Sequence, residues 1–257
     1  MSVRSSFRTT ARKMKILSLD STAKTATAAL CEDETLLAEY TLNNGNTHSE
    51  TLLPMVESIL SAFSLKPHDV ELFACAAGPG SFTGVRIGVA TVKGLAFGSG
   101  RPAVGVSTLE ALARNLDFGN TAAEAREPKI ICPVMDARRG QLYTARFARR
   151  GGGLERLTPD RAIAYSEFEA ETLPLGKVWL CGDGYSLVRG LMPEGSTFET
   201  PEQLRYQSAY SVALSALGAY RRGEVKDAES LRPVYLRLSQ AERERAERLA
   251  SSSPSSK

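Results

Sequence analysis

Apolar and polar residues alternate in short blocks over the first part of the chain. Three apolar stretches are separated by short polar turns: 15–19, 25–31 and 36–42. Their length and alternation are typical of strands that form a meander. From 52 to 63, apolar residues recur three and four positions apart, which predicts an amphipathic helix. Thr47 and Glu50 fit a capping box at the start of this helix.

Two further strand and helix pairs follow. An apolar run at 72–77 predicts a buried strand, and the periodic segment 85–98, rich in small residues, predicts a helix. A strand at 103–106 precedes a helix that begins at Ser107, where Glu110 completes a second capping box. The first part of the chain is therefore predicted to have the order βββαβαβα.

The remainder of the chain has a less regular pattern. A strand at 130–135 turns through a hairpin at 137–140 and returns over 142–147. Another strand, 178–181, leads into a Gly-Asp-Gly turn and a short helix, and 208–221 has helical periodicity. This pattern predicts a second, smaller α/β unit.

The segment 78–84, Gly-Pro-Gly-Ser-Phe-Thr-Gly, lies between a predicted strand and a predicted helix. Such a turn can present backbone N–H groups to an anion or to a partner. Ser81 or Thr83 can cap the first turn of the helix. The alternative is a tight turn with a purely structural role, and the spacing alone does not decide between the two.

Charge and composition narrow the classes of function. Of the 257 residues, 42% are hydrophobic and 24% are charged, as in an ordinary soluble domain. The net charge is +3, but four basic residues and no acid lie in the first 13 residues, so the body carries 3 − 4 = −1. A nearly neutral body does not indicate a nucleic-acid surface. We expect no membrane association, because no apolar run approaches the roughly 20 residues that span a bilayer.

The cysteines and histidines do not form a metal-binding pattern. The four cysteines lie in apolar runs without a Cys-x-x-Cys motif, which fits the reducing cytoplasm, and the two histidines are His48 and His68. We therefore expect no metal site. Residues 1–13 are predicted to be a disordered leader, and 238–257 a disordered or frayed tail.

The identities of the residues in the glycine-rich segment are more informative than the spacing of its glycines. Residues 78–96, GPGSFTGVRIGVATVKGLA, closely resemble the signature of the TsaB (YeaZ) family. Other segments match in the order of that family: 16–22, 48–54, 105–112, 136–143, 182–184 and 233–237. The resemblance covers roughly residues 14 to 237.

The resemblance implies a two-domain α/β fold of the actin, sugar-kinase and Hsp70-like (ASKHA) class. The first domain would span 14–114 with the order βββαβαβα, and the second, smaller and degenerate, would span 115–207. The helix 208–222 would pack back on the first domain.

The resemblance also implies a function. TsaB-like proteins are non-catalytic subunits that bind and activate a TsaD-type subunit, which threonylcarbamoylates a tRNA adenosine next to the anticodon. The chain lacks the His-x-x-x-His pair that TsaD uses, since its two histidines are twenty residues apart. The implied partners are TsaD, a TsaE-type ATPase and tRNA through the complex, and a second copy of the chain when alone.

The same resemblance places the partner interface on two helices of the first domain. The expected interface residues are His48, Leu52, Leu53, Val56, Ile59, Leu60, Val85, Arg86, Val89 and Val92. Arg86 is also a candidate contact for ATP or ADP at that interface, although we expect no tightly bound cofactor in the chain alone. No residue is expected to be catalytic.

Two enzymatic alternatives are weighed against this interpretation. A small ATP-dependent phosphotransferase of the same superfamily would use Asp20 and Asp183 as a carboxylate pair across a cleft. The turn after Asp20 has no glycine, however, so Asp20 and Thr22 also fit a simple hydrogen-bonded turn. A serine peptidase would need Ser81 as nucleophile, but the motif is not Gly-x-Ser-x-Gly.

Overall fold

The computed structural model describes residues 13–45, 47–117, 129–150, 153–225 and 227–237. The predicted leader, apart from Lys13, and the predicted tail lie outside the described residues, as does most of the segment after residue 117 that leads into the second unit.

The first sheet has five strands in the order β3-β2-β1-β4-β5. They are β1 (Lys15–Asp20), β2 (Ala26–Glu32), β3 (Thr35–Leu42), β4 (Leu72–Ala76) and β5 (Ala103–Val106). The first three strands form an antiparallel meander, and β4 and β5 add in parallel beside β1. With the intervening helices, the predicted order βββαβαβα is confirmed.

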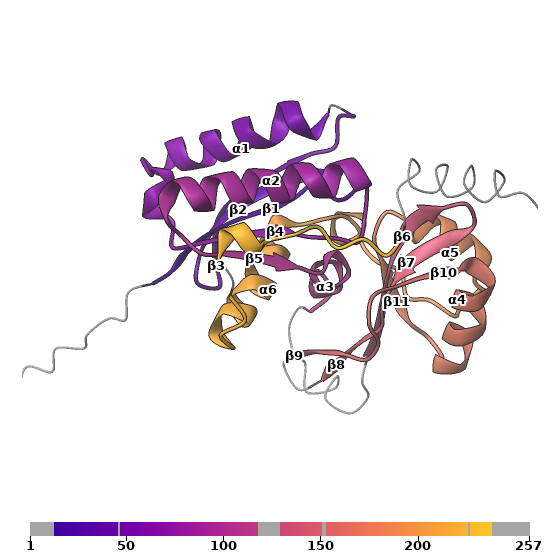
Figure 1. The fold of residues 1–257 in the computed structure, drawn as a ribbon. Helices are drawn as coiled ribbons and strands as arrows, with labels where there is room; N and C mark the ends of the chain where they lie inside the picture. Colours follow the sequence, from indigo (N-terminus) through magenta and orange to yellow (C-terminus); the bar gives the residue numbers. More distant parts are fainter. Residues whose placement is uncertain (1–12, 46, 118–128, 151–152, 226, 238–257) are drawn as a thin grey trace, which may run out of the picture.

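Helices cover both faces of this sheet (Figure 1). The helices α1 (His48–Ala62) and α2 (Phe82–Ser99) lie on one face, where Leu17 and Leu19 point into a shared core. The helix α6 (Ala209–Arg221) packs on the other face, where Ile16 points. The side chains of β1 point alternately into two apolar layers, so residues on both faces of the strand are apolar. This explains why the sequence of the strand is a nearly continuous apolar run.

The second sheet has six strands, with the long strand β6 at its centre. They are β6 (Lys129–Arg138), β7 (Gln141–Thr144), β8 (Phe147–Arg150), β9 (Gly153–Arg156), β10 (Arg161–Ala164) and β11 (Trp179–Cys181). The helices α4 (Tyr165–Thr172) and α5 (Tyr185–Leu191) pack against it. The predicted strands 130–135 and 178–181 correspond to β6 and β11. The single return strand predicted over 142–147 is wrong, because β7 ends at Thr144 and β8 begins at Phe147, and the two pair with different parts of β6. The strands β9 and β10 and the helix α4 were not predicted, because their short segments lack a clear period.

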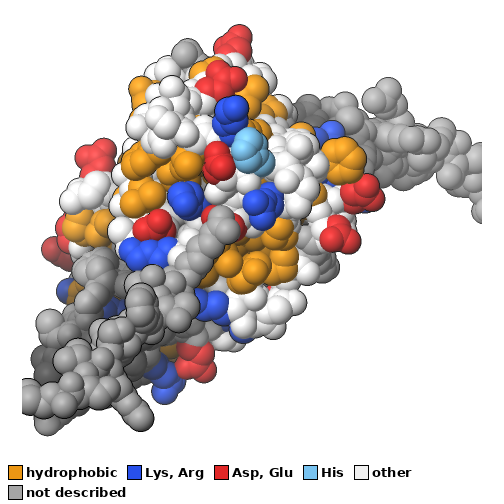
Figure 2. All heavy atoms as spheres, turned by 90° about the vertical axis from the view of Figure 1, so that its left-hand side faces the viewer, with side chains coloured by type: hydrophobic (Ala, Val, Ile, Leu, Met, Phe, Trp, Pro, Cys, Tyr) orange, Lys and Arg blue, Asp and Glu red, His pale blue; other side chains and the backbone are white. Residues whose placement is uncertain are grey.

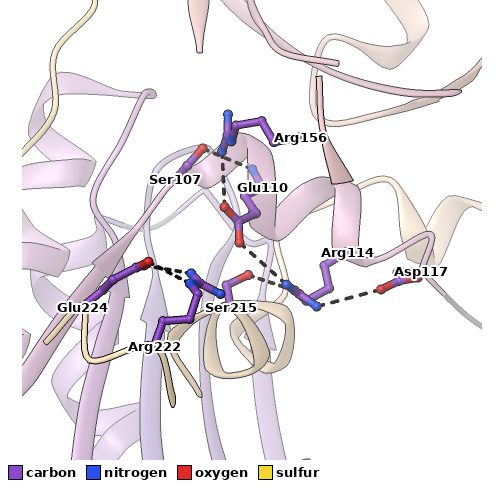
Figure 3. A network of polar contacts seen from close by, with 8 residues as sticks. All are labelled: Ser107, Glu110, Arg114, Asp117, Arg156, Ser215, Arg222 and Glu224. Carbon is purple, nitrogen blue, oxygen red and sulfur yellow. Dashed lines mark hydrogen bonds and ion pairs between the residues drawn. The ribbon is translucent and has the colours of Figure 1, made fainter. Parts of the chain in front are cut away.

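The helix α3 (Thr108–Arg114) joins the two units. Leu109 and Leu112 are buried in a cluster with residues of β6 and β8. On its polar side, Glu110 lies 3.6 Å from Arg114 and 3.3 Å from Arg156 of β9 (Figure 3). The Nε of Arg114 also donates to Ser215 of α6 at 3.0 Å, so α3 is tied to both units by apolar and polar contacts.

Short 3₁₀ turns complete the described structure: η1 (Pro67–Asp69), η2 (Leu173–Leu175), η3 (Glu202–Leu204) and η4 (Ala228–Ser230). Within the described residues, no helix combines the length and apolar character needed to cross a bilayer.

The helix caps confirm some predictions and correct one. The Ser81 hydroxyl accepts from the N–H of Gly84 at 3.3 Å, and the Ser107 hydroxyl accepts from the N–H of Glu110 at 3.2 Å. Thr47 precedes α1 as predicted, but its side chain does not cap the helix. Its hydroxyl instead accepts from Ser49 at 3.4 Å, a neighbour that competes for the same oxygen. The capping box predicted at the start of α1 is therefore wrong. At α3 only the Ser107 half of the predicted box is observed, because the Glu110 carboxylate pairs with Arg114 and Arg156.

Candidate functional site

A cleft of about 660 Å³ lies where the two units face each other. The β1–β2 turn, the start of α1 and the glycine-rich loop line it from the first unit. The β6–β7 hairpin and Asp183 line it from the second. The segment 234–237 completes the lining, and Figure 1 shows this end of the chain, in yellow, running from the first sheet towards β6.

The glycine-rich loop packs tightly on the β1–β2 turn. The N–H of Ser81 donates to the carbonyl of Thr22 at 2.7 Å, and the Ser21 hydroxyl donates to the carbonyl of Gly84 at 2.9 Å. A Cβ on Gly84 would lie 2.0 Å from the carbonyl oxygen of Ser21, so only glycine fits this close approach. The N–H of Val85 is also bonded within the loop. The N–H groups of Ser81, Gly84 and Val85 are therefore not free to hold an anion, which supports a structural role for these three positions.

A strap formed by residues 233–237 holds the two units together across the cleft. The N–H of Val234 donates to the carbonyl of Ala77 at 2.7 Å, and the Tyr235 ring stacks on Phe82 with centroids 4.6 Å apart. At the other end, Arg237 donates to the backbone carbonyls of Ala137 and Arg138 in the β6–β7 hairpin. Sequence reasoning singled out this segment only as a resemblance, because no local pattern indicates what it contacts.

Arg86 lies beside this strap and contacts Phe82 and Tyr235, two residues that line the cleft. Its Nε donates to the Tyr235 hydroxyl at 2.8 Å, and its guanidinium lies 3.8 Å from the centre of the Phe82 ring. No carboxylate among the described residues pairs with it. The aromatic contacts therefore position an exposed guanidinium that can still accept an anion. The predicted nucleotide contact of Arg86 stays a prediction.

Asp20 is buried beneath the turn that it precedes, with only 1% of its surface exposed. Its Oδ1 accepts from the N–H of Thr22 at 2.8 Å and from the Thr22 hydroxyl at 2.7 Å. Its Oδ2 has no hydrogen-bond partner among the described residues. Burial raises the pKa of Asp20 from its ordinary value of 3.8 to about 7, and the charge of Asp183 adds to the rise. The hydrogen-bonded turn expected for Asp20 and Thr22 is confirmed.

Asp183 faces the same cleft from the second unit. Its Oδ1 accepts from the N–H of Asp136 at 3.3 Å. Loss of solvent around the carboxyl raises its pKa, and the charge of Asp136 adds to this effect. Within the described ranges, no group of three or more His, Cys, Asp or Glu side chains has the arrangement of a metal site.

His48 anchors the start of α1 rather than standing free on the surface. Its Nε2 lies 2.7 Å from the carbonyl oxygen of Ala23, so Nε2 is the protonated nitrogen that donates. Its Nδ1 is buried and has no partner among the residues that the structure describes. His48 is half-buried, so only the exposed part of its side chain is available for the predicted partner interface.

The apolar residues predicted to contact a partner lie in the core instead. Each of the following is at most 5% exposed: Leu52, Val56, Ile59, Leu60, Val85, Val89 and Val92. Helical periodicity identifies the face that is buried, and here that face packs on the chain's own sheet. Leu53 is the exception, at 46% exposed, and Phe97 on α2 is 69% exposed. The outward face of α1 and α2 is therefore formed mostly by residues that lie between the predicted interface residues in the sequence.

Figure 2 views the end of the molecule that lies on the left of Figure 1. Hydrophobic side chains are exposed there between basic and acidic ones, and the basic side chains of the described residues are scattered over this face. The mixture is more typical of a protein contact than of a surface for the phosphate backbone of a nucleic acid.

Comparisons with known proteins agree with this architecture. A family model described as "TsaD: tRNA N6-adenosine threonylcarbamoyltransferase" matches residues 35–244. The tRNA threonylcarbamoyladenosine biosynthesis protein TsaB of Bacillus subtilis is 33% identical over 232 residues, which cover 89% of this chain and 96% of that protein. TsaB of Escherichia coli is 30% identical over 226 residues, covering 87% and 95%.

A solved structure also matches. YeaZ from Pseudomonas aeruginosa is 28% identical, has a TM-score of 0.71, and the match covers 87% of this chain and 100% of that one. With the sheet order described above, this likeness confirms the ASKHA-like fold class. The chain therefore belongs to the TsaB (YeaZ) family.

Proposed function

We propose that this chain is the non-catalytic subunit that binds and activates a TsaD-type catalytic subunit. The reaction is threonylcarbamoylation of a tRNA adenosine next to the anticodon. The observation that carries the proposal is the 33% identity to TsaB over 89% of the chain. The match to the TsaD family model does not make this chain catalytic, because its two histidines are twenty residues apart and cannot form a His-x-x-x-His pair.

We assign the docking surface to the outward face of α1 and α2. Leu53 on α1 and Phe97 on α2 are large, apolar and exposed. On α2, Ala90 and Gly94 are exposed and lie on the same helical stripe as Phe97, because the positions are three and four residues apart.

Gly94 supports this assignment. A Cβ added there would meet nothing within 4 Å, so no contact inside the protein requires glycine. Glycine in a helix interior costs about 1 kcal/mol relative to alanine. Close approach of a partner helix gives a reason for this cost, since small residues allow two helices to pack closely.

We extend the proposal to the remaining partners that the resemblance to the family implies. The isolated chain would form a homodimer through this face, and a TsaE-type ATPase and tRNA would join through the complex. ATP or ADP would bind at the partner interface, with Arg86 as the contact from this chain. The four cysteines are buried and free, which fits action in a reducing cytoplasm.

Reconstitution tests the proposal. Cognate TsaD-type and TsaE-type subunits are assayed for tRNA modification with and without this chain, and with the variant Leu53→Arg. Leu191→Arg is the matched control, because Leu191 is 48% exposed against 46% for Leu53 but lies on α5. We expect modification to require the chain, Leu53→Arg to lose binding and activity, and Leu191→Arg to keep both. Full modification without this chain would refute the proposal.

The observation that favours a phosphotransferase is that Asp183 lines the cleft and its charge acts on Asp20, which lies buried behind it. Asp20 is nevertheless sealed from solvent and bonded to its own turn. ATP turnover by the purified chain, lost in Asp183→Asn, would establish this alternative in place of the scaffold role.

A further inference from the structure

The strap of residues 233–237 is anchored to the first unit by its backbone. The N–H of Val234 donates to the carbonyl of Ala77, and the carbonyl oxygen of Val234 would lie 2.3 Å from a Cβ on Gly78. Gly78 has a φ of 117°, a conformation that glycine adopts readily and other residues do not. The strap is therefore packed directly on the backbone at the start of the glycine-rich loop.

The other end of the strap is bonded to a strained turn of the second unit. Arg138 and Arg139, at the tip of the β6–β7 hairpin, have φ values of 65° and 56°. Left-handed backbone is unfavourable for residues with a Cβ, and it persists where the surroundings fix it. Arg237 donates to the carbonyls of Ala137 and Arg138, which belong to the peptide groups on either side of the first strained residue. The position of Arg237 is therefore tied to the conformation of this turn.

Tyr235 lies between the two anchors, and through it the strap holds Arg86. Its ring stacks on Phe82, and its hydroxyl accepts from the Nε of Arg86 at 2.8 Å. Tyr235 and Arg237 are two positions apart, and two residues of extended chain span at most about 7 Å. Because so little slack is available, the place of the Tyr235 hydroxyl depends on where the second unit holds Arg237.

The two units are also joined at α3, where Leu109 and Leu112 pack with residues of β6 and β8. A joint of this kind allows one unit to turn against the other, as in the hinge motions of two-domain proteins. The strap lines the cleft and forms a second tie between the units. Turning of the second unit about α3 therefore displaces the end of the strap at Arg237 relative to the end at Gly78.

We propose that the strap couples the angle between the two units to the position of the Arg86 side chain. With the units held as described, Tyr235 fixes the guanidinium against the Phe82 ring. When the second unit turns away, Arg237 draws the strap with it and the Tyr235 hydroxyl leaves Arg86. A change in the second unit thereby reaches the start of α2, the helix assigned above to docking. The coupling itself does not depend on that assignment, because it is measured in the chain without a partner.

The Nε–H signal of Arg86 in nitrogen-15 NMR of the full chain tests the coupling, and its loss in Arg86→Lys assigns it. Tyr235→Phe removes the acceptor, so its spectrum gives the position of the signal for a released guanidinium. Arg237→Ala removes the anchor on the second unit and should move the signal most of the way towards that position. Arg221→Ala is the matched control, because Arg221 pairs with Glu34 within the first unit at 2.6 Å, and it should leave the signal unchanged.

A second measurement reports on the angle between the units. The four native cysteines are buried, so nitroxide labels can be directed to Ser58→Cys on α1 and Ser186→Cys on α5, two exposed positions. Double electron–electron resonance should give one narrow distance distribution, broader in Arg237→Ala and unchanged in Arg221→Ala. If Arg237→Ala does not fold, Arg237→Met keeps an unbranched side chain without a donor and serves in its place. The proposal is overturned if loss of the Arg237 guanidinium leaves either the Arg86 signal or the distance distribution unchanged, or if Tyr235→Phe leaves the Arg86 signal at its original position.

Discussion

Replacing the buried carboxyl of Asp20 by an amide should change how stability depends on pH. The pKa of Asp20 is about 7 in the folded protein against an ordinary value of 3.8. Between these values the unfolded chain releases the proton and the folded chain keeps it. The free energy of unfolding therefore falls as pH rises from about 4 to about 7, and the loss is complete above the folded pKa.

The size of the effect follows from the same two values. A difference of about 3 pKa units corresponds to about 4 kcal/mol, at 1.36 kcal/mol for each unit. Asp20→Asn keeps an oxygen that accepts from the N–H and hydroxyl of Thr22, as Oδ1 does now at 2.8 and 2.7 Å. The variant should therefore match the wild type near pH 4 and exceed it by roughly 2–4 kcal/mol at pH 8.

Urea unfolding of both proteins at half-unit steps from pH 4 to pH 8.5 measures this difference. Ionisations that the two proteins share cancel, so the difference curve reports on Asp20. Asp33→Asn, in the β2–β3 turn, controls for replacing a carboxyl by an amide and should show no gain above pH 7. A constant difference across the pH range, or a less stable Asp20→Asn protein at pH 8, would refute the reasoning.

Four further substitutions test the packing, the helix caps and the proposed surface. Gly84→Ala should destabilise the protein by about 1–3 kcal/mol in urea unfolding, because its Cβ would lie 2.0 Å from the Ser21 carbonyl; an unchanged midpoint would contradict the tight loop. Gly94→Ala should stabilise the isolated chain by about 1 kcal/mol. In calorimetry it should weaken the complex with a TsaD-type subunit. Equal or tighter binding would show that Gly94 does not lie in the interface. Ser107→Ala should lower the free energy of unfolding by about 0.5–2 kcal/mol, because it removes a helix cap. Thr47→Ala should lower it much less, because the Thr47 side chain does not cap its helix. Equal shifts in the melting temperatures of the two variants would contradict this contrast.

Local patterns were sufficient to predict most elements that position the cleft. The strand 103–106 was predicted at its observed bounds, and the helix predicted to start at Ser107 begins at Thr108 with Ser107 as its cap. Alternation and a cap indicate the same structure in both cases. The segments that form β9, β10 and α4 are too short for a period to emerge, so they gain their structure from neighbours in the second sheet.

The sequence alone was enough to identify the family and, through that resemblance, the fold class, because the residues of several segments match the family in order. Local spacing predicted which face of each helix is apolar. The tertiary structure alone decided how those faces are used. The residues of α1 and α2 that recur with the helical period are buried against the sheet of their own unit, whereas Leu53 and Phe97 are exposed. The tertiary structure also brought Tyr235 onto Phe82, and it buried the side-chain amide of Gln207 without a hydrogen-bond partner among the described residues. Such contacts join residues that are far apart in the chain, so no local period records them.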